Sequence, residues 1–404
     1  MKSRFAILIA ALASGFLYSC MDFRADPYGG QLNNVVLRLV YPAGYEDCIR
    51  EGIGIVAEDV NTGSRYAYTS DATGRTEARL PDGIYRFSAS DRNGADIFNT
   101  TLDHVLVSDL DLEVTLNFIH TETGSLLIKE VYSGGCSMAP LEGTYQSDKY
   151  LILHNNIDRT IYLDSLCLGT IAPYNSSGNN PWTDEAERFS LVRIVQALWQ
   201  FGGDGDDFPL LSGEDAIICL NGAIDHTIQY PLSVNLNRKD CFVCYNTTYF
   251  PNPFYHPAPG PLIRPERILN VVIKTGQANA FTVSLSSPVL VIFKAKGTTI
   301  QDFVRIPENV VQIPGSTADR VVCIPPEWIL DGVEIFDGRS SSNTKRLSPR
   351  IDAGHATLSD IFQGHALSRK IDRESSEKYN YEILQDTNNS TNDFYERDTQ
   401  SLHD

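Results

Sequence analysis

Three aspartates alternate with glycine in the segment Gly203-Asp204-Gly205-Asp206-Asp207. Carboxylate oxygens are the ligands that calcium prefers, so Asp204, Asp206 and Asp207 are the candidate metal ligands of this chain. The segment lacks the later bidentate glutamate of an EF-hand loop. An acidic hairpin turn accounts for the same residues, so we expect no cofactor, with calcium as the alternative.

A second segment that could bind a ligand combines aromatic side chains with proline. Six prolines between Asn246 and Pro265 stiffen this part of the chain. Aromatic side chains displayed on such a loop can stack on sugars or dock against a protein. The candidate binding residues are Tyr249, Phe250, Phe254, Tyr255 and His256. Packing of these side chains onto the protein's own core is the alternative.

Eight cysteines are present, and Cys241 and Cys244 form the one Cys-x-x-Cys pair. Such a pair is typical of a zinc half-site or of a redox centre. Here it lies in an apolar segment with a strand pattern, in which residues three apart point to opposite faces. We therefore expect a structural role for the pair. Cys167 and Cys219 also lie in apolar strand patterns, which predicts buried core positions.

The sequence lacks the motifs of the common catalytic sites: Gly-x-Ser-x-Gly, a Walker loop, a Rossmann fingerprint and His-Glu-x-x-His. Its eight histidines are scattered, with His154 and His226 in strand-like contexts. We interpret both as core histidines bonded to the backbone in preference to a pair of metal ligands. We expect no catalytic residue and a non-catalytic binding protein. A hydrolase or metalloenzyme acting on glycans or peptides is the alternative.

Composition favours a protein built from strands. The 404 residues are 42% hydrophobic, which is enough for sizeable cores, and they include 20 prolines and 29 glycines, which mark turns. Aromatic residues, at 10%, prefer strands. The formal net charge of −18 argues against nucleic acid as a partner, because phosphate contacts need clustered lysine and arginine.

The first twenty residues have the pattern of a targeting segment. Two basic residues precede an apolar stretch over residues 5–17, which is too short to span a bilayer as a helix. Leu17-Tyr18-Ser19-Cys20 resembles the cleavage site of a bacterial lipoprotein. The resemblance implies a signal peptide at residues 1–19 and lipidation of Cys20. Residues 20–34 then predict a flexible tether.

Residues 35–120 have the period-two alternation of a small β-sandwich. Turn signals such as Asn61-Thr62-Gly63 and Asn93-Gly94 separate the apolar runs. The strand start Gly83-Ile84-Tyr85 resembles the carboxypeptidase regulatory-like or prealbumin-like sandwich. Such domains usually serve as spacers or docking modules.

Residues 121–364 predict a larger β-sandwich. The run Tyr150 to Asn156, followed by Tyr162 to Cys167, resembles strands of a lamin-tail-like sandwich. Residues 185–201 fit a helix or a strand, and we favour a strand because Gly202-Gly203 follows and the context is β. Residues 365–404 form a polar C-terminal segment whose final strand we expect to pair back with the sandwich. The predicted fold class is therefore all-β, with a small sandwich followed by a larger one.

The order of these parts resembles the DUF4876 family of Bacteroidetes lipoproteins, and Asp386-Thr387-Asn388-Asn389-Ser390 fits its C-terminal pattern. The family has no established chemistry. Its members resemble cell-envelope proteins found beside TonB-dependent receptors, which implies an outer-membrane location facing the periplasm or the cell surface. The expected partners are the membrane through the lipid anchor, a TonB-dependent receptor or other envelope protein, and a glycan ligand. An adhesin or structural spacer is a further alternative.

Overall fold

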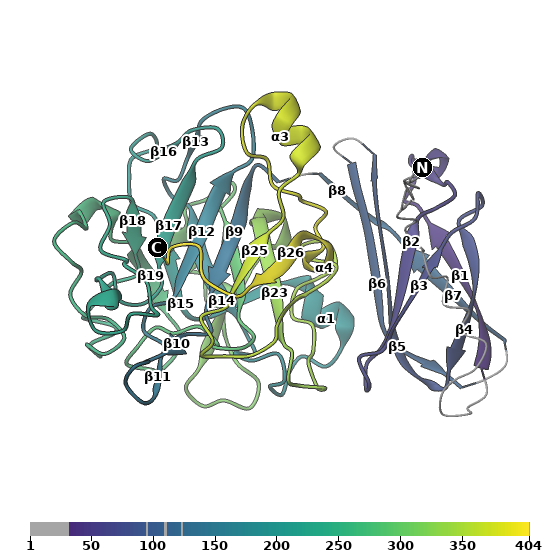
Figure 1. Cartoon of the computed structure of the whole chain (residues 1–404), viewed down its shortest axis with the longest axis horizontal. Helices are drawn as coiled ribbons and strands as arrows, with labels where there is room; N and C mark the ends of the chain where they lie inside the picture. Colours follow the sequence, from purple (N-terminus) through teal and green to yellow (C-terminus); the bar gives the residue numbers. More distant parts are fainter. Residues whose placement is uncertain (1–31, 94–95, 109–110, 123, 404) are drawn as a thin grey trace, which may run out of the picture.

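The computed structural model describes residues 32–93, 96–108, 111–122 and 124–403. Two β-sandwiches of different size lie side by side, the small one first in the chain (Figure 1). The all-β fold class predicted from the sequence is thus confirmed. The expected signal peptide and Cys20 lie outside the described residues. Within them, no helix is long and apolar enough to cross a membrane.

The small sandwich consists of a three-stranded and a five-stranded sheet. The three-stranded sheet has the order β4 (Arg75–Pro81), β1 (Leu32–Val40), β7 (Asp111–Asn117). The five-stranded sheet has the order β3 (Arg65–Thr69), β2 (Gly54–Asp59), β5 (Gly83–Asn93), β6 (Asp96–Val107), β8 (Ile119–Glu122). Alternate side chains of β1, Val35, Leu37 and Leu39, are buried between the sheets, as their spacing predicts.

The strand pattern of the small sandwich differs from the expectation at its start. Residues 32–34, assigned to the tether, already belong to β1, because Asn33 is buried and its side-chain amide donates to the Leu80 carbonyl and the Asp82 carboxylate. The polar residues at this position gave no strand pattern, because the partners of Asn33 lie almost 50 residues further along the chain.

The large sandwich packs a six-stranded sheet against an eight-stranded sheet. The six-stranded sheet has the order β18 (Cys241–Val243), β17 (Asp215–Cys219), β12 (Tyr150–Asn155), β9 (Leu126–Tyr132), β25 (Ala366–Arg369), β26 (Phe394–Arg397). The other sheet has the order β21 (Val310–Gln312), β22 (Arg320–Ile324), β15 (Val192–Gln200), β14 (Cys167–Ile171), β20 (Val289–Phe293), β23 (Ile329–Asp337), β24 (Ala356–Leu358), with β19 (Asn270–Lys274) also pairing with β15.

Short elements complete this sandwich. The two-stranded pairs are β10 (Cys136–Ser137) with β11 (Thr144–Tyr145) and β13 (Ile161–Tyr162) with β16 (Pro209–Leu210). The helices are α1 (Glu185–Ser190), α2 (Ile300–Phe303), α3 (Arg373–Tyr379) and α4 (Ser390–Asp393). The segment 185–201, expected as a strand, therefore begins as a helix. Asp184 caps this helix by accepting from the Glu187 amide at 2.9 Å, and the strand starts only at Val192.

The main core lies between the two large sheets. Leu151 and Leu153 of β12 face Trp199 of β15 and Ile292 of β20 across this core. Cys244 belongs to the same core, whereas Cys241 packs on the outer face of the six-stranded sheet with Tyr150 and Cys219. The two cysteines of the Cys-x-x-Cys pair thus lie on opposite faces, as the strand pattern predicts.

The two sandwiches are docked against each other through specific contacts. His355 of the large sandwich stacks on Phe336 at 4.2 Å, and Arg86 of the small sandwich lies over the same phenyl ring. The side-chain amide of Asn389 donates to Ser90 Oγ at 2.9 Å, and that of Asn388 donates to Thr121 Oγ1 at 3.0 Å. Burial lowers the pKa of His355 well below its ordinary value, so the imidazole is neutral between these partners. These contacts hold the small sandwich against the large one.

Candidate functional site

A buried carboxylate, Asp164, organises the loop that joins β15 to β16. Its Oδ1 accepts the backbone N–H groups of Gly205 and Asp207 at 3.0 and 3.1 Å, and its Oδ2 accepts that of Phe208 at 3.1 Å. The side chain is buried, yet these backbone donors lower its pKa against the opposing effect of burial. Asp164 is therefore a charged centre around which the loop folds.

Glycine is required where this loop passes over Asp164. Gly203 has a φ of +95°, and a Cβ there would lie 2.0 Å from Asp164 Oδ1. Its neighbour Gly202 has space, since its nearest contact would be Asn270 Nδ2 at 3.7 Å. The Gly202-Gly203 pair thus brings the backbone into direct contact with the carboxylate.

The three candidate calcium ligands lie on the outside of this loop. Asp204, Asp206 and Asp207 are exposed, and the Asp207 carboxylate accepts the Asp204 amide at 2.7 Å. The inward-facing groups of the loop are N–H donors, whereas a calcium ion would require oxygen atoms there. The three aspartates therefore do not form an inward ligand set, because the loop folds around the carboxylate of Asp164, 41 residues before Gly205.

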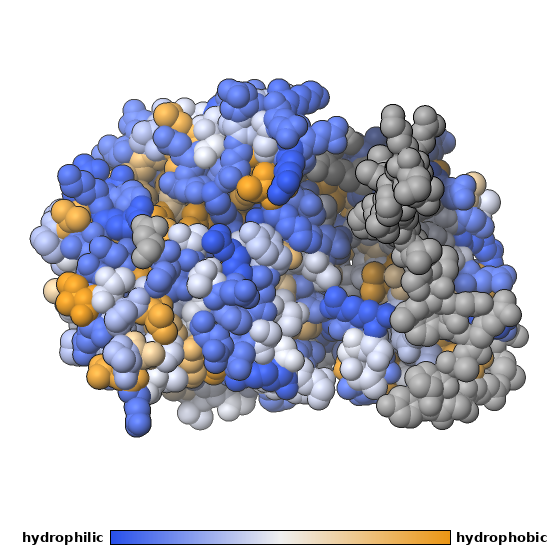
Figure 2. All heavy atoms as spheres, in the orientation of Figure 1, coloured by the Kyte–Doolittle hydropathy of each residue, from blue (hydrophilic) through white to orange (hydrophobic). Residues whose placement is uncertain are grey.

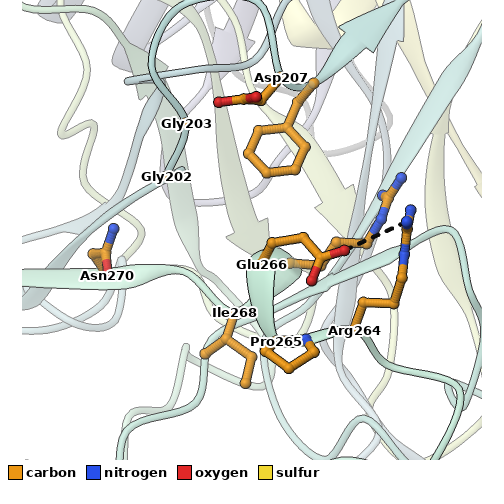
Figure 3. Close-up of a pocket in the computed structure, with 10 residues that line it drawn as sticks. Gly202, Gly203, Asp207, Arg264, Pro265, Glu266, Ile268 and Asn270 are labelled. Carbon is orange, nitrogen blue, oxygen red and sulfur yellow. Dashed lines mark ion pairs between the residues drawn. The ribbon is translucent and has the colours of Figure 1, made fainter.

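A polar groove lies beside the Gly202-Gly203 turn (Figure 3). Its first hollow has a volume of about 450 Å³. Asp207 comes from the loop on one side, and the short helix η3 (Pro265–Arg267) with its flanking residues forms the other. Arg264 and Glu266 form an ion pair at 3.4 Å on this wall. Pro265, Ile268 and Phe208 add an apolar surface.

A second hollow of about 510 Å³ continues from the first, sharing Gly202, Gly203 and Asn270 with it. Amide and hydroxyl groups line this part. Gln301 donates to the Gln200 side chain at 2.6 Å, and Lys294 donates to the Tyr162 carbonyl at 2.7 Å. Burial lowers the pKa of Lys294. The remaining polar lining residues are Ser165, Thr298 and Thr299.

Sequence reasoning found only the rim of this groove, through Asp207. It missed Asn270, Gln200 and Gln301, because a single amide in a strand or a short helix gives no motif. It also assigned Asp164 to a strand. The residue lies in a turn in which Ser165 has a φ of +60°, and a non-glycine residue with positive φ is uncommon. No sequence pattern marks the pairing of Asp164 with the later glycine-rich turn, because the groups that Asp164 accepts are backbone N–H groups.

The aromatic loop lies differently from its prediction as a displayed surface. Phe250 is buried and packs against Trp199 with ring centroids 5.8 Å apart. His256 is also buried, and its Nε2 accepts the Phe281 amide at 3.0 Å. Tyr249 and Phe254 are exposed, and Tyr255 is half-buried. The five residues therefore do not form one surface, because the loop covers the end of the core with two of them.

Among the described residues, the group that brings three metal-ligand atoms together is His154, Asp215 and Glu382. The ammonium group of Lys129 already bridges the two carboxylates, at 2.6 Å from each. The ring nitrogens of His154 face Asp215 Oδ1 at 2.7 Å and the Glu382 carbonyl at 2.9 Å. Lysine thus supplies the cation that balances this group. His226 has other partners: Tyr145 Oη and the Gly222 carbonyl.

The described cysteines are all free thiols, and all except Cys48 are buried. Burial raises the pKa of Cys136 and that of Cys167 to about 12, and it raises those of Cys219 and Cys244 well above the ordinary value. These thiols are therefore protonated at neutral pH and are weak nucleophiles. Cys167 and Cys219 occupy core positions, as the strand pattern predicts.

Comparison with known proteins connects this architecture to a family. The model of DUF4876, a family described as a protein of unknown function, matches residues 212–401. A crystal structure of a DUF4876 family protein from Bacteroides thetaiotaomicron is similar over 90% of this chain and 94% of that chain, with 22% identity and a TM-score of 0.59. This similarity concerns the fold. The resemblance noted from the sequence motifs is thereby confirmed.

Two further structures share short regions with this chain. A candidate adhesin from Bacteroides ovatus has 10% identity over 35% of this chain and 53% of its own, with a TM-score of 0.18. A DUF3823 family protein from Parabacteroides merdae has 14% identity over 36% of this chain and 68% of its own, with a TM-score of 0.17. No curated protein matches the chain.

Proposed function

Because the family model that matches residues 212–401 describes a protein of unknown function, we propose a function from the geometry. The protein is a non-catalytic lipoprotein of the bacterial cell envelope. It is anchored to the outer membrane through Cys20 and binds a ligand or partner as an accessory to a TonB-dependent uptake or surface complex.

The position of the groove is the observation that supports this proposal best. Strands β18 and β19 adjoin the groove wall at residues 264–270, and they lie at the end of the large sandwich away from the small one (Figure 1). The proposed anchor precedes the small sandwich in the chain. A lipid at Cys20 would attach ahead of the small sandwich, so the groove at the far end of the large sandwich stays clear of the anchor and open to a partner.

The docking of the two sandwiches supports the same proposal. A flexible joint between the two sandwiches would allow many relative orientations. The contacts of Arg86 and Asn389 hold the large sandwich in one orientation relative to the small one. A fixed arrangement of the two sandwiches lowers the entropy lost when the protein joins a membrane complex. The space-filling view shows mostly hydrophilic residues on the large sandwich with separate hydrophobic spots (Figure 2), which agrees with contact between folded proteins in water.

The chemical state of the candidate nucleophiles favours binding over hydrolysis. The thiols of Cys136 and Cys167 are protonated, because burial raises the pKa of each. His154 and His226 have both ring nitrogens engaged with oxygen atoms within the fold. Reaction at any of these groups would require the surrounding strands to open first.

The test is recovery of the full-length lipoprotein from solubilised outer membranes, followed by mass spectrometry of the proteins that accompany it. We expect a TonB-dependent receptor in stoichiometric amount. The matched control is Cys20→Ala, which we expect to leave the membrane fraction and to recover no receptor. Isolation of the wild-type lipoprotein alone, or membrane retention of Cys20→Ala, contradicts the proposal.

A further inference from the structure

We infer that the groove at the Gly202-Gly203 turn binds a neutral oligosaccharide, an inference that rests on the proposed binding function and names the ligand class. Two hollows of about 450 and 510 Å³ meet at Asn270, and each alone has the size of a small-molecule site. Their arrangement suits a linear ligand with at least two units, one in each hollow.

The hydrogen-bonding groups of the groove match hydroxyl groups. Asn270 is exposed at the junction of the hollows, and Gln301 is exposed in the second. A side-chain amide donates and accepts, and a hydroxyl group does the same, so the two are complementary in both directions. A carboxylate ligand can only accept, so it would use the N–H groups of Asn270 and Gln301 and leave their amide oxygens without a donor from the ligand.

The charges of the first hollow favour a neutral ligand. The guanidinium of Arg264 pairs with Glu266, and that of Arg267 donates to the Asp240 carbonyl at 3.1 Å while lying over the Phe242 ring. Asp207 adds a further carboxylate to the lining, beside the exposed Asp204 and Asp206. An acidic sugar would have to compete for arginines that already have partners and would meet several carboxylates.

The first hollow also has an apolar side. Pro265 and Ile268 lie next to each other along one edge of the close-up (Figure 3). The C–H faces of a pyranose ring pack on such surfaces while its hydroxyl groups reach the polar side. This combination distinguishes a sugar from a small inorganic ion.

The Asp164-centred loop prepares the groove for binding. Three backbone N–H groups of the loop are fixed on one buried carboxylate, so the groove wall needs little ordering when a ligand arrives. The aspartate side chains of the loop point outward, and Asp207 lines the first hollow.

The experiment uses the full mature chain in detergent on an array of neutral and uronate-containing oligosaccharides, followed by calorimetry with the best neutral probe. We expect binding of a neutral oligosaccharide. Asn270→Ala and Gln301→Ala should each weaken it about tenfold, the loss of one good hydrogen bond. Both side chains are exposed, so the fold should persist, and unchanged thermal unfolding verifies this.

Phe254→Ala is the matched control, because it removes an exposed aromatic side chain outside the groove lining. Binding that depends on Phe254 and not on Asn270 overturns the assignment to the groove. Exclusive binding of uronates, or no binding of any oligosaccharide, overturns the ligand class. Receptor recovery by the Asn270→Ala lipoprotein in the membrane experiment would leave the proposed envelope function standing even if the sugar assignment fails.

Discussion

Two loops of the large sandwich, Gly202–Phe208 and Tyr249–His256, are held in place by opposite means. The first is built on a polar centre: Asp164 receives three backbone N–H groups, and the aspartate side chains of the loop point to solvent. The second is held by apolar packing, with Phe250 against Trp199 and Phe281 in the core. Its proline and aromatic content suggested display, whereas its anchors are buried.

The comparison shows that conspicuous side chains are not by themselves the functional ones. In the second loop Phe250 and His256 are the anchors, which leaves Tyr249 and Phe254 outside. In the first loop an internal carboxylate does the anchoring, which leaves the loop's own polar groups free to line a groove. A loop with a polar centre therefore offers more chemistry at its surface.

The largest effect should come from Phe250→Ala. Removal of a buried phenyl ring creates a cavity beside Trp199, and we expect a loss of about 4 kcal/mol in the free energy of unfolding. Phe254→Ala, in the same loop but exposed, should change it by less than about 0.5 kcal/mol. Urea denaturation measures both. Equal effects of the two variants would show that the loop is not anchored as described.

Asp164→Ala tests the polar anchor. It leaves the backbone N–H groups of Gly205, Asp207 and Phe208 without their acceptor, and we expect a loss of about 3 kcal/mol. Hydrogen exchange should show faster exchange of these amides while those around Phe250 keep their protection. If the loop amides exchange at the wild-type rate, the carboxylate is not what holds them.

Gly203→Ala adds a single methyl group over Asp164. The new Cβ would lie 2.0 Å from Oδ1 in a left-handed backbone conformation, so we expect destabilisation of about 2 kcal/mol. Gly202→Ala is the control, since its Cβ would meet nothing closer than 3.7 Å. Thermal unfolding of the two variants distinguishes destabilisation by contact with the Asp164 carboxylate from destabilisation by the loss of a glycine alone.

Acidification should affect the first loop and spare the second. The pKa of Asp164 is lowered in the folded state, so its stabilising contribution is present above the unfolded value of about 3.9 and is lost as the pH falls below it. We expect proteolytic cleavage at the Gly202–Phe208 loop to accelerate in that acidic range with an acid-stable protease. The Asp164→Ala variant should lack this dependence. A wild-type loop that resists cleavage down to pH 2 would contradict the charged-centre interpretation.

Lys129→Ala should give the smallest change. The pairs of Lys129 with Asp215 and Glu382 are half-exposed, so we expect a loss of about 1 kcal/mol or less. Without the ammonium group, His154, Asp215 and Glu382 become an open ligand set, and zinc should raise the thermal unfolding temperature of this variant only. Equal stabilisation of the wild type by zinc would show that lysine does not occupy the cation position.

The local sequence was sufficient to predict part of the site and insufficient to predict the rest. The turn Gly202-Gly203 and the acidic loop after it were identified, because glycine and aspartate mark turns wherever they stand. Asp164 could not be assigned to that loop from the sequence. Its partners are backbone N–H groups, which almost every residue type has, so the residue types of the donors do not reveal the hydrogen bonds. The inward orientation of Phe250 and His256 depended on Trp199 and Phe281, which come from distant strands.

The sequence by itself determined the all-β class, the order of a small and a large sandwich, the buried faces of strands such as β1, and the opposite faces of Cys241 and Cys244. These follow from a period of two residues, which is local. Only the tertiary structure decided which carboxylate organises which loop, which aromatic side chains face inward, and how Phe336 and His355 meet Arg86 across the two sandwiches. The physical reason is that sheets join residues far apart in the chain, so the partner of each polar or aromatic group is set by strand order.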